Sequence, residues 1–182
     1  MVNGLPQKNA KIQIHIDKAW KDFTGDLILP DNKNIDIAFF TLLQPTTNAS
    51  TVELGDTVTF GKEGYFFGYP YGLHTDVDGE YLPFIKKLSV SATAQTGSPS
   101  PFLYLDGFNN PGFSGGPVAF YDYQKQKWEI VAVISGFQPE QAWKKVGGKY
   151  VPPSTLVNSG IIIAYFIDPA IKTLDKYIAD QK

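Results

Sequence analysis

The sequence predicts an all-β protein with one helix at its C-terminal end, and three observations support this fold class. Apolar and polar residues alternate in many short runs, as they do in strands with one buried face. Glycine, proline, asparagine and aspartate cluster between these runs, where turns require them. A helical spacing of apolar residues occurs only after Asp168. Because no helical pattern separates the strands, barrels or sandwiches are favoured over alternating β-α units.

The expected strands begin near the N-terminus, where Ile12, Ile14 and Ile16 alternate with polar residues. The polar face of this strand carries His15. Further apolar runs predict strands at 36–43, 64–70, 102–105, 117–121, 128–134 and 160–167.

The C-terminal helix has a recognisable start and an apolar face. Asp168 suits the N-cap and Pro169 suits the first helical position. Apolar side chains then recur at helical spacing, at positions 171, 174, 177 and 178. We therefore expect a helix that packs one side against the strands.

Composition excludes several classes of protein. The chain has 182 residues, of which 43% are hydrophobic and 19% charged, as in a folded globular protein with one domain or two small ones. A net charge of −2 without a basic run argues against nucleic-acid binding. The absence of cysteine removes disulfides and thiolate metal sites. With no signal-peptide pattern and no apolar run long enough to span a bilayer, we expect a soluble chain that has no membrane partner.

The most specific motif runs from Asn110 to Val118 and places Ser114 among glycines. Glycines allow a sharp turn that exposes the serine hydroxyl. The same turn can direct the backbone N–H groups of Gly112 and Ser114 at one point, as an oxyanion hole requires. This pattern occurs in two unrelated designs of serine hydrolase.

The order of residues excludes the α/β-hydrolase design. In that design the serine lies between a strand and a helix, and the histidine follows it. Here an apolar strand follows Ser114, and both histidines of the chain, His15 and His74, precede it.

The chain resembles the trypsin-like peptidases, the bacterial HtrA-like ones especially. Residues 105–118 resemble the nucleophile loop of that family, and 36–42 resemble the strand that carries its acid. The turn at 68–73 resembles its Gly-x-Pro-x-Gly motif, and the closing strand and helix match its ending. The resemblance covers residues 11–180 and includes the family's order of acid before serine.

The resemblance implies a two-barrel fold and a set of site residues. Ser114 is the implied nucleophile, Asp36 orients the base, and the amides of Gly112 and Ser114 form the oxyanion hole. The implied substrate pocket is lined by Phe108, Ser135, Gly136 and Phe137. Without an obvious charge there, we expect the pocket to favour an uncharged apolar residue on the acyl side of the cut bond. The alternative is that Asp106, the nearest acid in sequence, reaches the pocket.

The implied first barrel is incomplete. Residues 1–50 supply roughly three strands where the family fold uses six, whereas 51–182 supply the second barrel and its helix within one structural unit. The polar stretch 44–56 is the expected connector. Unpaired strand edges in an unclosed barrel favour aggregation.

The catalytic histidine is the chief departure from the family. His15 lies too close to Asp36 within an alternating strand, and His74 follows the acid, so we predict that both are solvated. Neither has a neighbour at metal-ligand spacing, and no metal or other cofactor is expected. Residues 1–4 resemble the segment that follows the family's histidine, so Met1 is expected to be internal, with the histidine immediately upstream.

Three functions remain open from the sequence. The first is a serine endopeptidase that acts on peptides or proteins and lacks its base as given. The second is an inactive homologue that binds peptides in the former substrate cleft, and the third is a structural module that keeps the fold. The presence of both Ser114 and Asp36 in the glycine frame favours the first function.

Overall fold

The computed structural model describes residues 10–30, 32–42, 55, 58–94, 102–151 and 156–180. Near the N-terminus, three strands form an antiparallel sheet in the order β1-β2-β3. These strands are β1 (Ala10–Ile16), β2 (Ala19–Ile28) and β3 (Phe39–Leu42). Strands β1 and β2 are joined by a tight turn at Asp17 and Lys18, where both residues have positive φ.

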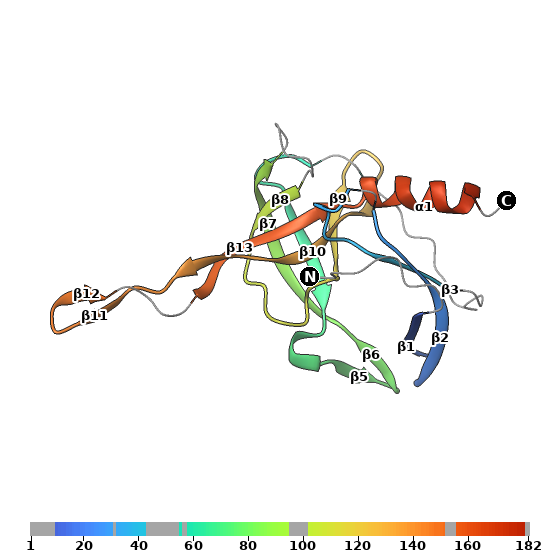
Figure 1. Cartoon of the computed structure of the whole chain (residues 1–182), viewed down its shortest axis with the longest axis horizontal. Helices are drawn as coiled ribbons and strands as arrows, with labels where there is room; N and C mark the ends of the chain where they lie inside the picture. Colours follow the sequence, from blue (N-terminus) through green and yellow to red (C-terminus); the bar gives the residue numbers. More distant parts are fainter. Residues whose placement is uncertain are drawn as a thin grey trace.

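A closed barrel follows, with the strand order β10-β13-β8-β7-β4-β9 (Figure 1). Its strands are β4 (Glu63–Gly68), β7 (Phe84–Ala94), β8 (Phe102–Asp106), β9 (Pro117–Asp122), β10 (Lys127–Gln141) and β13 (Leu156–Phe166). Alternate residues of these strands point inward because side chains alternate along a strand. The inward set forms most of the main core, which includes Phe66, Leu103, Leu105, Phe120, Ile134 and Ile162, and Phe113 joins it from the loop between β8 and β9.

Two small hairpins lie outside the barrel. One is formed by β5 (Thr75–Val77) and β6 (Glu80–Leu82), and it follows a short 3₁₀ turn, η1 (Pro70–Gly72). The other is formed by β11 (Lys144–Val146) and β12 (Lys149–Val151), with Gly147 and Gly148 at its tip. Figure 1 shows the second hairpin at the end of a long extension of β10 and β13 that projects from the barrel.

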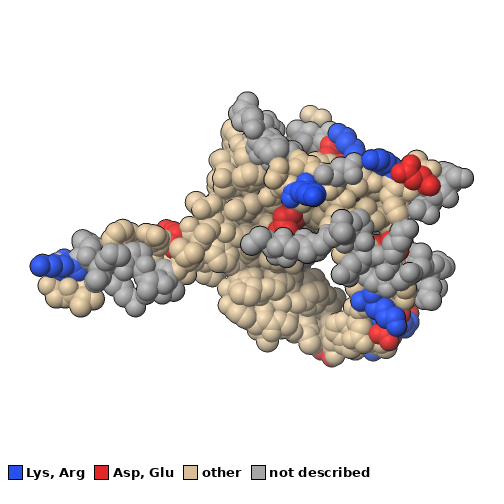
Figure 2. Space-filling view, viewed as in Figure 1, with Lys and Arg blue, Asp and Glu red and all other residues tan. Residues whose placement is uncertain are grey.

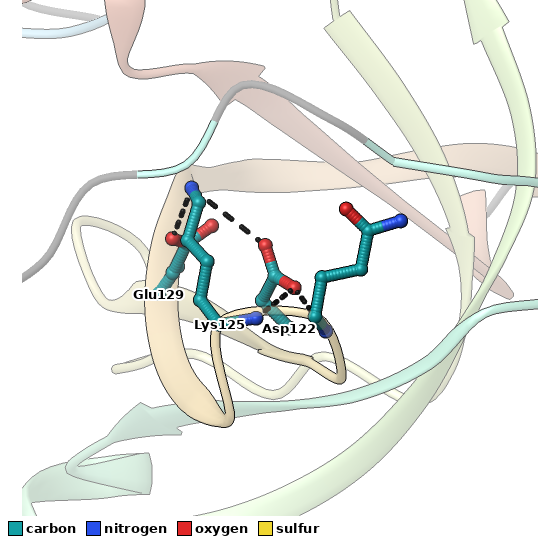
Figure 3. Close-up of polar contacts among 4 residues, drawn as sticks. Asp122, Lys125 and Glu129 are labelled. Atoms are coloured by element: carbon teal, nitrogen blue, oxygen red, sulfur yellow. Dashed lines mark hydrogen bonds and ion pairs between the residues drawn. The ribbon is translucent and has the colours of Figure 1, made fainter.

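The turn between β9 and β10 is fixed by a charged group (Figure 3). The Asp122 carboxylate accepts backbone N–H bonds from Gln124 at 2.8 Å and from Lys125 at 3.0 Å. These bonds, the one from Lys125 first, lower the pKa of Asp122. The Lys125 ammonium lies 2.7 Å from Oε1 of Glu129, a buried residue of β10. The turn therefore supplies the partner that a buried carboxylate requires.

The helix α1 (Asp168–Asp180) closes the chain, and its start lies one residue earlier than the sequence predicts. The Ile171 N–H donates to the Ile167 carbonyl at 3.0 Å, which makes Ile167 the N-cap and Asp168 the first helical residue. The local preference for aspartate is still met because a carboxylate in the first turn faces the positive end of the helix dipole.

Helix α1 ties the N-terminal sheet to the barrel. Ala170 is fully buried against Ile35 and Ile37 in a second core cluster, which the barrel residues Val133 and Tyr165 join. The Tyr177 hydroxyl donates to Asp26 Oδ2 on β2 at 2.7 Å. The two parts of the fold are thus held together by apolar packing and a charged hydrogen bond.

We predict that Tyr177→Phe lowers the Tm at neutral pH. The bond to Asp26, and secondly burial, raises the pKa of Tyr177. A raised pKa contributes stability below the ordinary tyrosine value of about 10, and that contribution disappears as the pH rises through the raised value. Thermal unfolding across this pH range should therefore show a difference from the wild type that closes at high pH. Tyr123→Phe, at an exposed site, is the control, and equal Tm values at neutral pH would contradict the prediction.

The all-β core with one C-terminal helix is confirmed, but several strands were not predicted. The sequence prediction expected roughly three strands in residues 1–50 but placed no strand at β2, and it missed β7 and both outer hairpins. The strand expected from Asp36 begins instead at Phe39, so Asp36 lies in an irregular segment. Nearly all of the predicted connector 44–56 lies outside the described residues.

Candidate functional site

The loop that carries Ser114 connects β8 to β9, and its outer side rests on η1. The Tyr69 N–H donates to the Gly112 carbonyl at 3.0 Å, and the Tyr71 N–H donates to the Pro111 carbonyl at 2.9 Å. Gly112 has a φ of +102°, and a Cβ atom there would lie 2.2 Å from the Tyr69 carbonyl oxygen. Only glycine fits this position, because a side chain would meet both backbone strain and a rigid backbone atom.

The inner side of the loop is bonded to β10. The Gly115 N–H donates to the Ile134 carbonyl at 2.7 Å, and the Ile134 N–H donates to the Gly116 carbonyl at 2.9 Å. Phe113 anchors the loop in the core, where it is fully buried and its ring centroid lies 4.8 Å from that of Phe66. The Phe113 side chain is therefore inaccessible to a ligand.

Of the five backbone N–H groups from Gly112 to Gly116, this bonding uses three. The N–H groups of Phe113, Gly115 and Gly116 all donate to backbone carbonyls. Within the described part of the chain, the N–H groups of Gly112 and Ser114 donate no backbone bond. Both residues are exposed. The loop thus offers two preorganised donors beside an exposed hydroxyl, as an oxyanion hole needs.

Asp36 is held by its neighbours in the chain. Ile35 and Ile37 are buried on either side of it in the second core cluster, which turns the carboxylate outward. The Ser135 hydroxyl donates to Asp36 Oδ2 at 2.7 Å. Burial, and secondly the negative charge of Asp36, raises the pKa of Tyr165 on β13. Asp36 therefore sits against β10 and β13 at a defined place.

The loop that carries Ser114 and the acid Asp36 are bonded to two successive residues of strand β10. Ile134 bonds to the loop through Gly115 and Gly116, and the next residue, Ser135, bonds to Asp36. The β10–β13 register shifts between Ile134 and Gly136, which marks a bulge at Ser135. Bulges redirect side chains, and this one accounts for a serine that points at the carboxylate. Ser135, which the sequence assigns to the substrate pocket, is thus a partner of the acid.

Beyond Ile134, one edge of β10 pairs with no strand among the described residues. The pairing of β10 with β9 ends at Val133, opposite Pro117, whereas its pairing with β13 continues to Gln141. Gly136 and Phe137, two predicted pocket residues, lie on this stretch, and Phe137 is 36% exposed. An open strand edge offers N–H and C=O groups to an extended peptide.

A lysine that no sequence pattern indicated lies beside the remaining predicted pocket residue, Phe108. Lys86 on β7 donates to the Phe108 carbonyl and to Asn110 Oδ1. Its ammonium lies 5.4 Å from the centroid of the Phe108 ring, which is 52% exposed. Burial lowers the pKa of Lys86. No local pattern predicts this contact, because Lys86 is far from the loop in sequence. The pairing of β7 with β8 brings the two together.

The sequence predicts that both histidines are solvated, but the structure shows each of them stacked on an aromatic ring. Both stack on Tyr81 of β6, with ring centroids 3.9 Å away for His15 and 3.8 Å for His74. Trp20 packs edge-on against His15, so the aromatic group joins the β1–β2 and β5–β6 hairpins. Alternation in sequence shows only that the His15 side chain points away from the core. It cannot show that a second hairpin covers this outer face of the strand.

Neither histidine has a contact with Asp36 or Ser114 among the described residues. The described part of the chain also contains no cluster of three histidine, aspartate or glutamate residues that could hold a metal ion. Its one helix is too short and too polar to cross a bilayer.

No protein-family model matches this chain, and no curated protein matches it either. The assignment of a function therefore depends on the geometry around Ser114 and Asp36.

Proposed function

We propose that this chain has the two-barrel trypsin-like fold and is a serine endopeptidase that forms an acyl-enzyme on Ser114. The observation that carries the proposal is the pair of amides at Gly112 and Ser114, which donate to no backbone carbonyl of the described residues, in a loop bonded to Ile134. The next residue along β10, Ser135, bonds to Asp36. Nucleophile, oxyanion donors and acid are thereby tied to the same short stretch of backbone.

In the proposed mechanism, an imidazole between Asp36 and Ser114 accepts the hydroxyl proton while Ser114 Oγ attacks the substrate carbonyl carbon. The amides of Gly112 and Ser114 bind the resulting oxyanion. The C–N bond then breaks, and the imidazolium returns its proton to the leaving amine. A water molecule cleaves the acyl ester by the same route, which releases the acid product and frees Ser114.

The substrate in this mechanism uses the open edge of β10. Its acyl part adds as a strand beside Ser135 and Phe137, since neighbouring strands of this barrel are antiparallel. The exposed rings of Phe108 and Phe137 favour an apolar side chain next to the cut bond.

We predict that free imidazole gives this chain a Ser114-dependent hydrolytic activity. Neither His15 nor His74 reaches Asp36, so the chain alone should neither cleave peptides nor react with a fluorophosphonate. An imidazole that enters the space between Asp36 and Ser114 supplies the missing base. Hydrolysis of an activated apolar ester should then rise with imidazole concentration and saturate, and a fluorophosphonate should label Ser114 under the same conditions.

The control is Ser114→Ala, which should show only the solution rate of imidazole with the ester. Cleavage by the 182-residue chain without imidazole would contradict the prediction that the chain lacks a general base. Identical imidazole-dependent rates for the wild type and Ser114→Ala would refute the peptidase proposal.

A second candidate, a peptide-binding homologue without catalysis, is favoured by the engagement of both histidines with Tyr81. Peptide binding along β10 with no labelling of Ser114, even when imidazole is present, would support this alternative.

A further inference from the structure

Strand β10 continues from the candidate site into a projecting arm. We define the arm as residues 137–151 and 156–159, which comprise the outer parts of β10 and β13 together with β11 and β12. Figure 1 shows that it extends away from the barrel and from α1. A single strand therefore runs from Ser135, which contacts Asp36, to the base of the β11–β12 hairpin.

The end of the arm carries positive charge without any acidic residue. Lysines occupy positions 144, 145 and 149, and no aspartate or glutamate occurs between Glu140 and Asp168. Lys145 and Lys149 are exposed, and Figure 2 shows lysine atoms gathered at the end of the arm. The whole chain is negative, with a net charge of −2, so the arm differs in sign from the rest of the protein.

Apolar side chains accompany these lysines. Trp143 is 59% exposed and Val146 is 64% exposed, and Val146 pairs with Lys149 across the hairpin. An exposed tryptophan beside cations is suited to bind a segment that combines acidic and apolar residues.

We infer that the end of the arm binds an acidic stretch of the substrate polypeptide, on the acyl side of the cut bond. This inference rests on the proposed function, and it follows from the direction of β10. A substrate strand antiparallel to β10 runs with its N-terminal part toward the arm. Ten residues separate Ser135 from Lys145, a span of about 33 Å in an extended strand. The acidic stretch should therefore lie about ten residues before the cut bond.

A polypeptide is favoured over an anionic bilayer because the arm is continuous with the open edge beside Ser114. A membrane contact would use the charge and Trp143 equally well, but it would give no role to that edge. Binding of a polypeptide should depend on the spacing between its acidic stretch and an apolar anchor, whereas binding of a bilayer should not. This dependence therefore distinguishes the two.

The test uses the 182-residue chain and fluorescent peptides, with binding measured by fluorescence anisotropy at low salt. The first peptide has four glutamates, ten neutral residues and a C-terminal phenylalanine amide. The second has the same composition, with the glutamates immediately beside the phenylalanine. We expect the first to bind at least about tenfold more tightly, and added salt should weaken it most.

A charge-reversed arm, K144E/K145E/K149E, should lose this tenfold preference. The matched control K11E/K33E/K172E reverses three lysines elsewhere, of which all are exposed, and it should keep the preference. Circular dichroism and Tm values of both variants check that each one folds. Lys→Gln replacements at the three arm positions should also reduce the preference, but by less. Because they introduce no carboxylates, they show that the loss does not come only from the new negative charges.

Equal binding of the two peptides, or an equal loss in both triple variants, would overturn the inference. Binding to phosphatidylserine vesicles that depends on the arm lysines, without any peptide preference, would assign the arm to a membrane instead. Peptide binding is measured without imidazole and needs no reaction at Ser114. Failure of the imidazole test with retained binding would therefore reject the peptidase and keep the docking site, whereas the reverse result would reject the docking site alone.

Discussion

Replacing Gly112 by alanine should remove nearly all imidazole-dependent hydrolysis at Ser114. The new Cβ atom would lie 2.2 Å from the Tyr69 carbonyl oxygen, at a φ of +102° that strains any L-residue. The Gly112 N–H must therefore turn away from the position of the oxyanion. Loss of one such donor costs about 10²–10³ in turnover.

Gly115→Ala is the matched control for this experiment. Gly115 also has a positive φ, +85°, but a Cβ atom there would meet nothing within 4 Å. Its substitution should cost about 1–2 kcal/mol of backbone strain and leave most of the activity. Rates and Tm values of both variants separate the two effects. A Gly112→Ala chain as active as the control would show that this amide does not serve the reaction.

Asp36→Asn should have a comparably large effect, because an amide cannot hold the imidazole in the required tautomer or stabilise its charged form. In an intact triad the corresponding change costs about 10⁴ in turnover. In the chain supplied with free imidazole, we expect the Ser114-dependent rate to disappear. Ile35 and Ile37 should keep the backbone in place, so the circular dichroism spectrum should not change.

Two further variants sharpen this prediction. Ser135→Ala removes the 2.7 Å bond to Asp36 but leaves its charge, so the rate should fall without disappearing. Asp175→Asn alters an exposed carboxylate on α1 and should behave as the wild type. If Asp36→Asn and Asp175→Asn gave the same rate, the role proposed for Asp36 would be wrong.

Much of the secondary structure could be predicted from the sequence because it depends on local patterns. Alternating residues around Ile12–Ile16 and the helical spacing after Asp168 describe which faces are apolar, and burial follows from that. Where alternation was weaker, the prediction failed. Strand β7 carries Lys86 and Lys87 in succession, and the strands of the outer hairpins are only three residues long.

The glycine frame around Ser114 was also readable from the sequence, since the unusual φ values of Gly112 and Gly115 are local requirements. The roles of Ser114 and Asp36 stay predictions, as do the two-barrel fold and the position of the base. Their test is chemical and is given by the imidazole and fluorophosphonate experiments.

Only the tertiary structure decided which distant residues meet. Ser135 binds an aspartate 99 positions away, Lys86 reaches across to the serine loop, and both histidines pack on Tyr81. The sequence by itself determined which faces are buried and where the chain can turn sharply, because these depend on residue type and spacing. Contacts between strands depend on register, bulges and barrel closure, which are set by the packing of the whole chain.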